Sequence, residues 1–374
     1  MDTVSTHVAA DMMNYMGYVV GNMGNHDVET GHAVYDRWIK QCNFPVLGAN
    51  IIDNATGKPY LKPYEVLERD GVRIAVLGMI TPAFLQWLPE KLWSGLHFEE
   101  MEPCARKWVK IIKEKENPDV IVGLFHAGKS GNVLGQVVED ASMDVAKRVP
   151  GFDVVLMGHD HTRECVKVQN VAGDSVLVID PANNANVVSD VTLTVTKKDG
   201  KVVEKSVEGR LADMNKYPVS REFMDKFAPQ YKAVNDFVSR KIGTISRTIT
   251  AKDAYFGSSP FIDLIHQLQL EISGAEVSFC APLSFRAEIK EGDIYVSDMF
   301  NLYKYENMLY VMELSGKEIK GFLEMAYAIW TNQMKSSEDH LMLFKEPVEK
   351  GKRANFKNFS FNLTLPQALI IRWT

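Results

Sequence analysis

The chain has 374 residues, of which 46% are hydrophobic, 10% aromatic and 24% charged. This is the composition of an ordinary folded protein, and it excludes disordered, collagen-like and disulfide-rich classes. With 42 Lys and Arg against 48 Asp and Glu, the net charge is −6, so we expect no broad basic surface and no nucleic-acid polymer as a partner. No apolar run approaches the roughly 18 residues that cross a bilayer, which predicts a chain without a membrane span.

The first part of the chain alternates short apolar runs with amphipathic stretches, a pattern that predicts an α/β layered domain. Helices are expected over residues 4–16 and 99–116, where apolar residues recur at helical spacing. A hairpin is expected over 188–209, with the turn at KKDGK. The predicted buried strands are FPVLGANI (44–51), VRIAVLGMI (72–80), DVIVGLFHAG (119–128), FDVVLMGHDH (152–161) and SVLVIDPA (175–182).

The character of the chain changes after a proline-led amphipathic stretch, which we interpret as a linker helix over 217–242. Beyond it we expect a smaller α/β domain: a helix over 260–273, a strand at EVSFCA, a strand pair around NLYKYENMLYVMELSG and a helix at GKEIKGFLEMAYAIW. The predicted organisation is therefore a larger first domain (1–216), the linker helix (217–242) and a smaller second domain (243–374).

Unusual polar residues follow several of these apolar runs directly, at the strand ends where α/β sheets place their sites. Imidazole together with amide or carboxylate oxygen suits first-row divalent ions, and such ions activate water in hydrolytic sites. We interpret Asp27 and Asp160 as caps of a loop or helix start. The remaining candidates at the strand ends are Asn25, His26, His126, His159 and His161.

The motifs GNMGNHDVETG, LFHAG and GHDH resemble those of the calcineurin-like metallophosphoesterases, in the branch of 5'-nucleotidases and 2',3'-cyclic-nucleotide 2'-phosphodiesterases. KIGT, FRAEIKEGDI and NLYKYENMLYVMELSGKEIKGFLE resemble the C-terminal 5'-nucleotidase domain of that branch. The resemblance implies an α/β (α+β) fold, in which a truncated four-layer metallophosphoesterase β-sandwich flanked by helices is followed by a linker helix and a smaller α/β nucleotide-binding domain.

The resemblance also implies two divalent metal ions, which could be Zn, Mn, Co or Fe. By position, Asn25 would ligate through its side-chain oxygen, and His126 and His159 would ligate the second ion. His161 would complete the first ion. These are four of the ligands that the family uses.

The catalytic pair that the resemblance implies is His26 with Glu29. His26 would donate a proton or hydrogen bond to the phosphoryl group and its leaving oxygen. Glu29, at a position where many relatives have Asp, would orient that imidazole. Glu keeps the charge but lengthens the side chain.

In the second domain, the resemblance places Arg286 on a phosphate or carboxylate of the substrate, which a planar guanidinium can grip with two hydrogen bonds. The alternative is a surface salt bridge to Glu288 or Asp293. Tyr305 would form one half of an aromatic clamp on the base. The alternative is a tyrosine of the core.

Two features depart from the family's pattern. The Asp-x-His and Gly-Asp motifs that supply the first metal and the bridging carboxylate are not found before Asn25, so we expect a missing N-terminal segment and an impaired two-metal centre. Residues 363–374 do not resemble the family, and we expect that they come from a one-base deletion in the coding sequence. The Leu, Ile and Trp side chains of this tail should then lie exposed.

The function that these residues and the resemblance predict is metal-dependent hydrolysis of nucleotide phosphate esters, as a 5'-nucleotidase, a 2',3'-cyclic-nucleotide phosphodiesterase or both. The expected partner is a nucleotide or cyclic nucleotide, and the chain is expected to be a monomer. Family resemblance predicts a bacterial protein that is periplasmic or extracellular when intact, with no signal peptide in this chain. Two alternatives stay open: a non-catalytic nucleotide-binding fragment, and a related enzyme acting on nucleotide sugars or sulfur-bonded sulfate.

Overall fold

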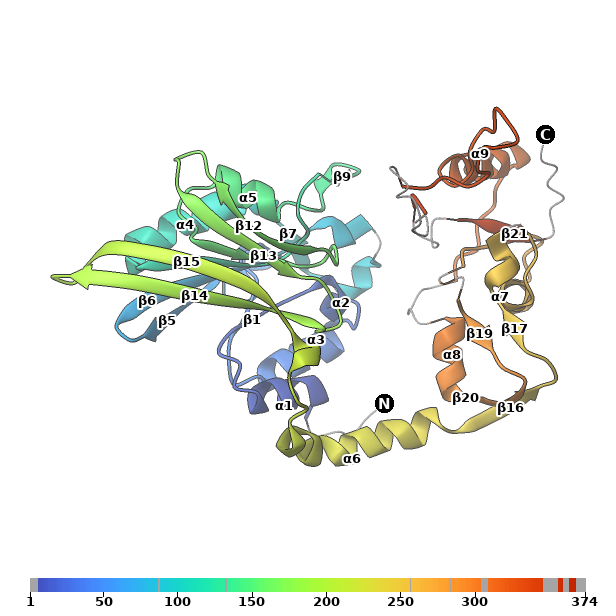
Figure 1. Ribbon diagram of the computed structural model, residues 1–374, viewed down its shortest axis with the longest axis horizontal. Coiled ribbons are helices and arrows are strands. Elements are labelled where there is room, and N and C mark those ends of the chain that lie inside the picture. The colour runs from blue at the N-terminus through green and yellow to red at the C-terminus, as the bar shows by residue number, and fades with distance from the viewer. Residues whose placement is uncertain are drawn as a thin grey trace. The chain divides into compact units, whose positions relative to one another are not determined.

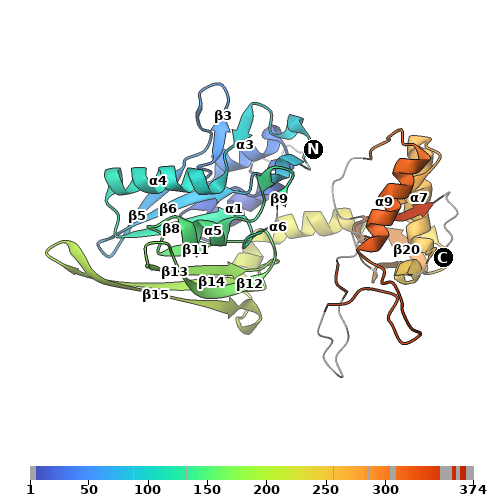
Figure 2. The ribbon, with the colours of Figure 1, turned by 90° about the horizontal axis from the view of Figure 1, so that it is seen from above.

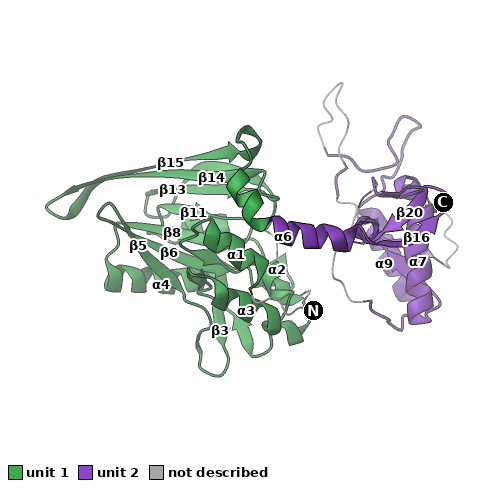
Figure 3. Cartoon of the chain, turned by 90° about the horizontal axis from the view of Figure 1, so that it is seen from below, with its two compact units in different colours: residues 1–227 green, residues 228–374 purple. Residues whose placement is uncertain are grey.

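The computed structural model describes residues 6–86, 88–131, 133–255, 257–282, 284, 286–303, 309–345, 356–358 and 363–367. The chain divides into two compact units, residues 1–227 and 228–374 (Figure 3), and each unit is described by itself. Helices and strands occur in both units. The mixed α/β architecture agrees with the predicted fold class.

A six-stranded sheet organises the first unit, with strand order β12-β13-β11-β8-β6-β5 (Figures 1 and 2). The four inner strands, β6, β8, β11 and β13, run parallel, and the two outer strands pair antiparallel with their neighbours. All carboxyl ends of the inner strands therefore lie at one edge of the sheet. The strands are β5 (Tyr64–Arg69), β6 (Val72–Ile80), β8 (Val120–His126), β11 (Val154–Leu156), β12 (Arg163–Gln169) and β13 (Ser175–Pro181).

Two helices, α4 (Met101–Glu116) and α5 (Ser142–Arg148), cover one face of this sheet. Their apolar sides and the sheet form a continuous core, because every third or fourth residue of α4 turns toward the strands. The predicted helix over 99–116 corresponds to α4 within two residues. Fully buried members of this core include Ala75, Leu77, Met79, Ala105, Ile112, Val145 and Val155.

The opposite face is covered by strands, so that the sheet lies between helices and a second β layer (Figure 2). The long hairpin of β14 (Val187–Lys198) and β15 (Lys201–Asp213) forms most of this layer. It turns where predicted, at Asp199 and Gly200, which have φ angles of 51° and 74°. Positive φ at both central residues is the geometry that Asp-Gly favours in a two-residue hairpin.

The second β layer also contains a short parallel pair, β1 (Gly21–Asn22) and β2 (Val46–Leu47), packed closely on β6. A Cβ at Gly78 of β6 would lie 2.3 Å from Leu47 Cβ and 2.4 Å from Asn22 Oδ1. Only glycine allows that approach. The close packing brings the end of β1 beside the end of β8.

A second core lies under the remaining elements of this unit. Helix α3 (His32–Gln41) carries the buried Tyr35 and Trp38 into it. The other elements are α1 (Val8–Tyr15), α2 (Asn25–Val28), β3 (Ile51–Asp53), β4 (Lys58–Pro59), β7 (Leu96–Phe98), β9 (Val133–Leu134), β10 (Val137–Val138) and the 3-10 helices Ala83–Gln86, Glu90–Leu92 and Met214–Lys216.

Helix α6 (Arg221–Val238) begins in the first unit and ends in the second. Its first turns are anchored to α1 by aromatic contacts: the ring centroids of Tyr15 and Phe227 lie 5.7 Å apart, and Tyr15 Oη donates to Glu222 Oε1 at 2.6 Å. From residue 228 to 237 every side chain is exposed.

The second unit is a small α/β assembly whose described strands pair two by two. Strand β16 pairs with β20, β17 with β19 and β18 with β21, all antiparallel. The predicted helix over 260–273 has the same bounds in the structure. The elements are β16 (Lys241–Ile245), β17 (Ile249–Thr250), the 3-10 helix Lys252–Tyr255, α7 (Pro260–Ser273), β18 (Ser278–Cys280), β19 (Glu288–Ile289), β20 (Gly292–Tyr295), α8 (Val296–Leu302), α9 (Gly316–Ala328) and β21 (Leu365–Gln367).

Two expectations for this unit are wrong. The strand pair expected around 301–316 is absent from its described part, since residues 296–302 form α8 and residues 309–315 form neither helix nor strand. Leu363 of the tail is only 3% exposed, packed in a cluster with Trp330, whereas it was expected to be exposed. Ile370 and Trp373 lie outside the described residues. Among the described helices, none combines the length and apolarity needed to cross a membrane.

Candidate active site at the carboxyl edge of the sheet

The predicted ligands lie where parallel strands of the first unit end. His126 is the last residue of β8, and His159 follows β11 after two further residues. Asn25 follows β1 at the start of α2. The α/β sheet therefore brings together residues that are more than 100 positions apart in sequence, at the edge where such sheets bind ligands.

His126 and Asn25 are in direct contact. His126 Nε2 lies 2.8 Å from Asn25 Oδ1, and Asn25 is 4% exposed. The backbone of Gly24 lies against the imidazole, so that a Cβ there would be 3.1 Å from His126 Cε1. Burial, helped by the charges of neighbouring histidines, lowers the pKa of His126 to about 3. The imidazole is therefore neutral at neutral pH, the state in which it ligates metals.

His159 lies beside His126, with ring centroids 5.3 Å apart. Its φ of 86° lies in a region that residues with a side chain rarely adopt. Such backbone conformations occur more often at functional sites than elsewhere. His159 Nε2 lies 2.9 Å from Glu139 Oε1. The amide oxygen of Asn25 and these two imidazoles form a donor set of the kind that binds first-row divalent ions.

The other predicted metal ligand, His161, is placed differently. Its side chain is exposed, and its Nδ1 lies 3.3 Å from Asn183 Nδ2. Within the described part of the chain, no three His, Cys, Asp or Glu side chains are grouped so that they could hold a metal ion. The donor set of this site therefore depends on Asn25 as its third member.

His26 and Glu29 form a pair within one turn of α2, with Nδ1 and Oε2 2.9 Å apart. The His26 side chain is 66% exposed, so its other nitrogen is open to a ligand. Asp27 accepts a hydrogen bond from the Gly24 amide at 2.8 Å, which makes it the predicted cap. Burial raises the pKa of Asp27.

Asp160 also has the predicted capping role, since its Oδ1 accepts from the Thr162 amide at 3.0 Å. Its Oδ2 accepts from the Lys129 amide at 2.8 Å. Beside it, Asp180 at the end of β13 is fully buried. Burial, together with the charge of the nearby Asp160, raises the pKa of Asp180 to about 7. This carboxyl pair supports the turn that carries His159 and His161.

In the second unit, Arg286 is exposed, and its amide donates to Ser284 Oγ at 3.1 Å. The two alternative partners considered for it pair elsewhere: Asp293 with Lys241 at 2.6 Å, and Glu288 with Lys290 at 3.6 Å. Tyr305 lies outside the described residues.

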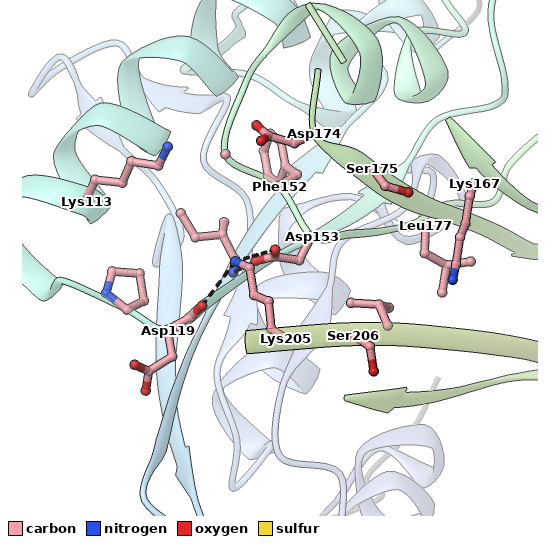
Figure 4. A pocket seen from close by; sticks show the side chains of 14 residues that line it. Lys113, Asp119, Phe152, Asp153, Lys167, Asp174, Ser175, Leu177, Lys205 and Ser206 are labelled. Carbon is pink, nitrogen blue, oxygen red and sulfur yellow. Dashed lines mark hydrogen bonds and ion pairs between the residues drawn. The ribbon is translucent and has the colours of Figure 1, made fainter. Parts of the chain in front are cut away.

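A cavity of about 520 Å³ lies at the opposite edge of the sheet, away from the histidines (Figure 4). It is bordered by residues that precede parallel strands, including Asp119 before β8 and Asp153 before β11. Two of its carboxylates pair with lysines of the hairpin: Asp153 Oδ1 lies 2.5 Å from Lys205 Nζ, and Asp119 Oδ2 lies 2.8 Å from Lys197 Nζ. These ion pairs join the β14–β15 hairpin to the sheet.

Sequence reasoning missed two carboxylates at the site, Glu139 and Asp180. Glu139 precedes α5, and Asp180 lies within an apolar strand. Neither belongs to a motif with recognisable spacing. The signal that could have found Asp180 is a charged residue in an otherwise buried run, because such residues are rarely buried without a partner.

Comparison with known proteins gives a consistent picture. The sequence profile of "5'-nucleotidase, C-terminal domain" matches residues 241–354. The chain is 26% identical over 375 residues to the 2',3'-cyclic-nucleotide 2'-phosphodiesterase/3'-nucleotidase of Yersinia enterocolitica, covering 86% of this chain and 56% of the relative. It is 30% identical over 161 residues to the 5'-nucleotidase of Vibrio cholerae, covering 42% of this chain and 29% of the relative. The predicted family resemblance is confirmed.

Solved structures show the same fold. A Staphylococcus aureus protein assigned to the 5'-nucleotidases superposes with a TM-score of 0.76 at 20% identity, covering 96% of this chain and 68% of that one. The calcineurin-like phosphoesterase YfkN of Bacillus subtilis superposes with a TM-score of 0.54 at 22% identity, covering 63% of this chain and 76% of that one. The chain spans 56% and 62% of the length of two cyclic-nucleotide phosphodiesterase relatives that it matches. The relatives named here are phosphoesterases and nucleotidases, which are hydrolases.

Proposed function

We propose that the first unit carries out metal-dependent hydrolysis of nucleotide phosphate esters, with a nucleotide or 2',3'-cyclic nucleotide as substrate. The observation that carries this proposal is the convergence of Asn25, His126 and His159 at the carboxyl edge of the sheet, with His126 Nε2 2.8 Å from Asn25 Oδ1. The names of the relatives support the substrate class.

Asn25, His126 and His159 would hold one divalent ion, which could be Zn, Mn, Co or Fe. Such an ion, when bound, polarises a phosphoryl oxygen and lowers the pKa of water. His161 would contribute to a second ion. Among the described residues, the ion at Asn25, His126 and His159 would have only three protein ligands, and one of them is an amide oxygen. We therefore expect slower turnover than is usual for the family.

His26 would act on the leaving group. Glu29 accepts a hydrogen bond from His26 Nδ1 across 2.9 Å, which fixes the ring and leaves Nε2 directed away from Glu29. From that position Nε2 would donate a proton to the leaving oxygen of the ester. The capping bond from Gly24 to Asp27 holds the turn that carries both side chains.

The second unit would bind the nucleoside part of the substrate. Arg286 would grip a phosphate or carboxylate oxygen, and its exposed side chain is compatible with that role. Tyr305 would stack on the base. The same resemblance supports a proposed location in the periplasm or outside the cell.

The test measures phosphate release from three substrates. With 3'-AMP and 5'-AMP the phosphate is measured directly. With 2',3'-cyclic AMP the monophosphate product is first hydrolysed by an added phosphatase after the reaction has been stopped. We expect release with Mn²⁺, none with excess EDTA, and about a 100-fold or larger loss in His26→Ala, which is typical for removal of a general acid. His97→Ala is the matched control, because His97 is exposed in the same unit and contacts Asn54 instead. Phosphate release at the same rate with and without EDTA, or an unchanged rate in His26→Ala, would contradict the proposal.

A nucleotide-binding protein without hydrolytic activity is the second candidate. The observation that favours it is that no three His, Cys, Asp or Glu side chains are grouped for a metal within the described ranges. Binding of AMP by the metal-free chain, with no phosphate release at any Mn²⁺ concentration, would select this candidate.

A further inference from the structure

We propose that Glu139 is a positioning residue for the metal site: it accepts the Nε2 proton of His159 and so directs the Nδ1 lone pair of that imidazole toward the ion. This inference rests on the proposed function for the ion itself. The tautomer that it assigns to His159 can be tested without any ion.

The contact between the two side chains is short and sheltered. His159 Nε2 and Glu139 Oε1 are 2.9 Å apart, and the side chains are 12% and 17% exposed. A carboxylate can only accept, so the ring nitrogen that faces it must carry the proton. In a neutral imidazole the other nitrogen, Nδ1, then holds the lone pair that a metal requires.

Glu139 is held in place by the residues that follow it. Asp140 Oδ1 accepts from the Gly128 amide at 2.8 Å, and Ser142 Oγ donates to the Ala127 carbonyl at 2.7 Å. Both bonds attach this segment to the backbone directly after β8, the strand that carries His126. The position of Glu139 is therefore set by the same strand end that sets one of the ligands.

The tight packing at Gly128 supports a fixed geometry. A Cβ there would lie 2.3 Å from Asp140 Oδ1 and 2.6 Å from Asp160 Cβ. The segment that carries Glu139 and the turn that carries His159 thus meet at one glycine. A hydrogen bond between carboxylate and histidine across this junction orients the ring and strengthens it as a ligand.

The first measurement is the tautomer of His159, read from two-bond ¹H–¹⁵N correlations in metal-free protein labelled with ¹⁵N-histidine. The His159→Asn spectrum assigns the signals. We expect a protonated Nε2 and an unprotonated Nδ1 in wild type and in Glu139→Gln, whose side-chain oxygen also accepts. We expect a loss of this single tautomer in Glu139→Ala.

The second measurement is Zn²⁺ affinity by calorimetry against a competing chelator. Glu139→Ala should bind about 10- to 100-fold more weakly than wild type, the usual cost of losing such a partner, and Glu139→Gln should lie closer to wild type. Glu164→Ala is the matched control, because Glu164 pairs with Lys129 at 2.5 Å, and its affinity should equal that of wild type.

The outcomes separate the two proposals. A wild-type chain that binds no Zn²⁺ would overturn the proposed function and with it the role of Glu139 at the ion, while the tautomer would still show whether Glu139 holds the His159 proton on Nε2. A protonated Nδ1 on His159, or equal Zn²⁺ affinity in wild type and Glu139→Ala, would overturn the positioning role. If Glu139→Ala does not fold, the wild-type tautomer and Glu139→Gln decide the question.

Discussion

The half-buried His126 and the fully buried Asp180 lie at the same edge of the sheet, and burial moves their pKa values in opposite directions. Burial disfavours the charged form of each group. The pKa of His126 falls to about 3 and that of Asp180 rises to about 7. Near neutral pH the imidazole is therefore neutral, and the carboxyl group is partly protonated.

The raised pKa of Asp180 predicts a pH-dependent stability. In the unfolded chain this carboxyl group has its ordinary pKa of 3.8. Ionisation of Asp180 therefore costs the folded state no stability below about pH 4. The cost grows between about pH 4 and 7 and is constant above about pH 7. In Asp180→Asn this penalty is removed, so the variant should gain stability over wild type as the pH rises through this window. The gain has an upper bound of roughly 4 kcal/mol.

Urea unfolding in EDTA at pH 4, 5.5, 7 and 8.5 measures this gain. The Ala182 amide, which donates to Asp180 Oδ1 at 2.8 Å, keeps an acceptor in the asparagine variant. Asp190→Asn, at an exposed ion pair with Arg210, is the control and should show no such rise. A stability difference between Asp180→Asn and wild type that does not change with pH would show that Asp180 ionises normally.

The sequence was sufficient to predict that His126 and His159 follow buried strands, because an apolar run that ends in a polar residue marks a strand end. The direct contact between Asn25 and His126 was not predicted, since the family resemblance implied only that each of them is a metal ligand. Glu139 could not be predicted, since its partner is 20 residues away and the contact depends on how the segment after β8 folds back. Contacts between loops depend on tertiary packing, which local patterns do not encode.

Among the secondary-structure elements, those with local signals were predicted best. Helix α7 has proline at its first position and Gly274 after its end, the two most reliable boundary signals. The β14–β15 hairpin has Asp-Gly at its turn. The expected strand over LYVMEL is wrong, since residues 309–315 pair with none of the described strands.

The close approach of β6 to the β1–β2 layer predicts that Gly78 cannot be replaced. In Gly78→Ala the new methyl group would overlap Leu47 and Asn22, so we expect a loss of about 1–3 kcal/mol, typical of overpacking. Gly158→Ala is the matched control, because no atom lies within 4 Å of its Cβ position. Chemical denaturation of the metal-free proteins measures both. Equal stability of Gly78→Ala and wild type would show that the layers are not in contact there.

The whole molecule has separate hydrophobic cores in its two units. Clusters around α3, α4 and the β14–β15 hairpin belong to the first unit, and clusters around α7 and Trp330 belong to the second. Helix α6 passes from one unit to the other, anchored at Phe227 and exposed from residue 228 to 237. A helical segment without packing contacts opens locally at low free-energy cost.

Limited proteolysis should therefore cleave the second half of α6 before the rest of the chain. Trypsin is expected to cut first after Lys232, and later after Lys226, whose Nζ lies 5.0 Å from the Tyr15 ring centroid in the anchored half. Mass spectrometry of early fragments identifies the sites. Phe227→Ala should accelerate cleavage after Lys226, because it removes part of the anchor. Early cleavage within the sheet instead of α6 would contradict the two-unit description.

The metal content of the purified chain tests the central claim most directly, that Asn25, His126 and His159 bind a divalent ion. After equilibrium dialysis against Mn²⁺ or Zn²⁺, elemental analysis should find at least one ion per wild-type chain and none in the Asn25→Ala/His126→Ala double variant. His97→Ala should retain the wild-type content. A wild-type chain without bound ion, or a folded double variant with the same content as wild type, would contradict the account.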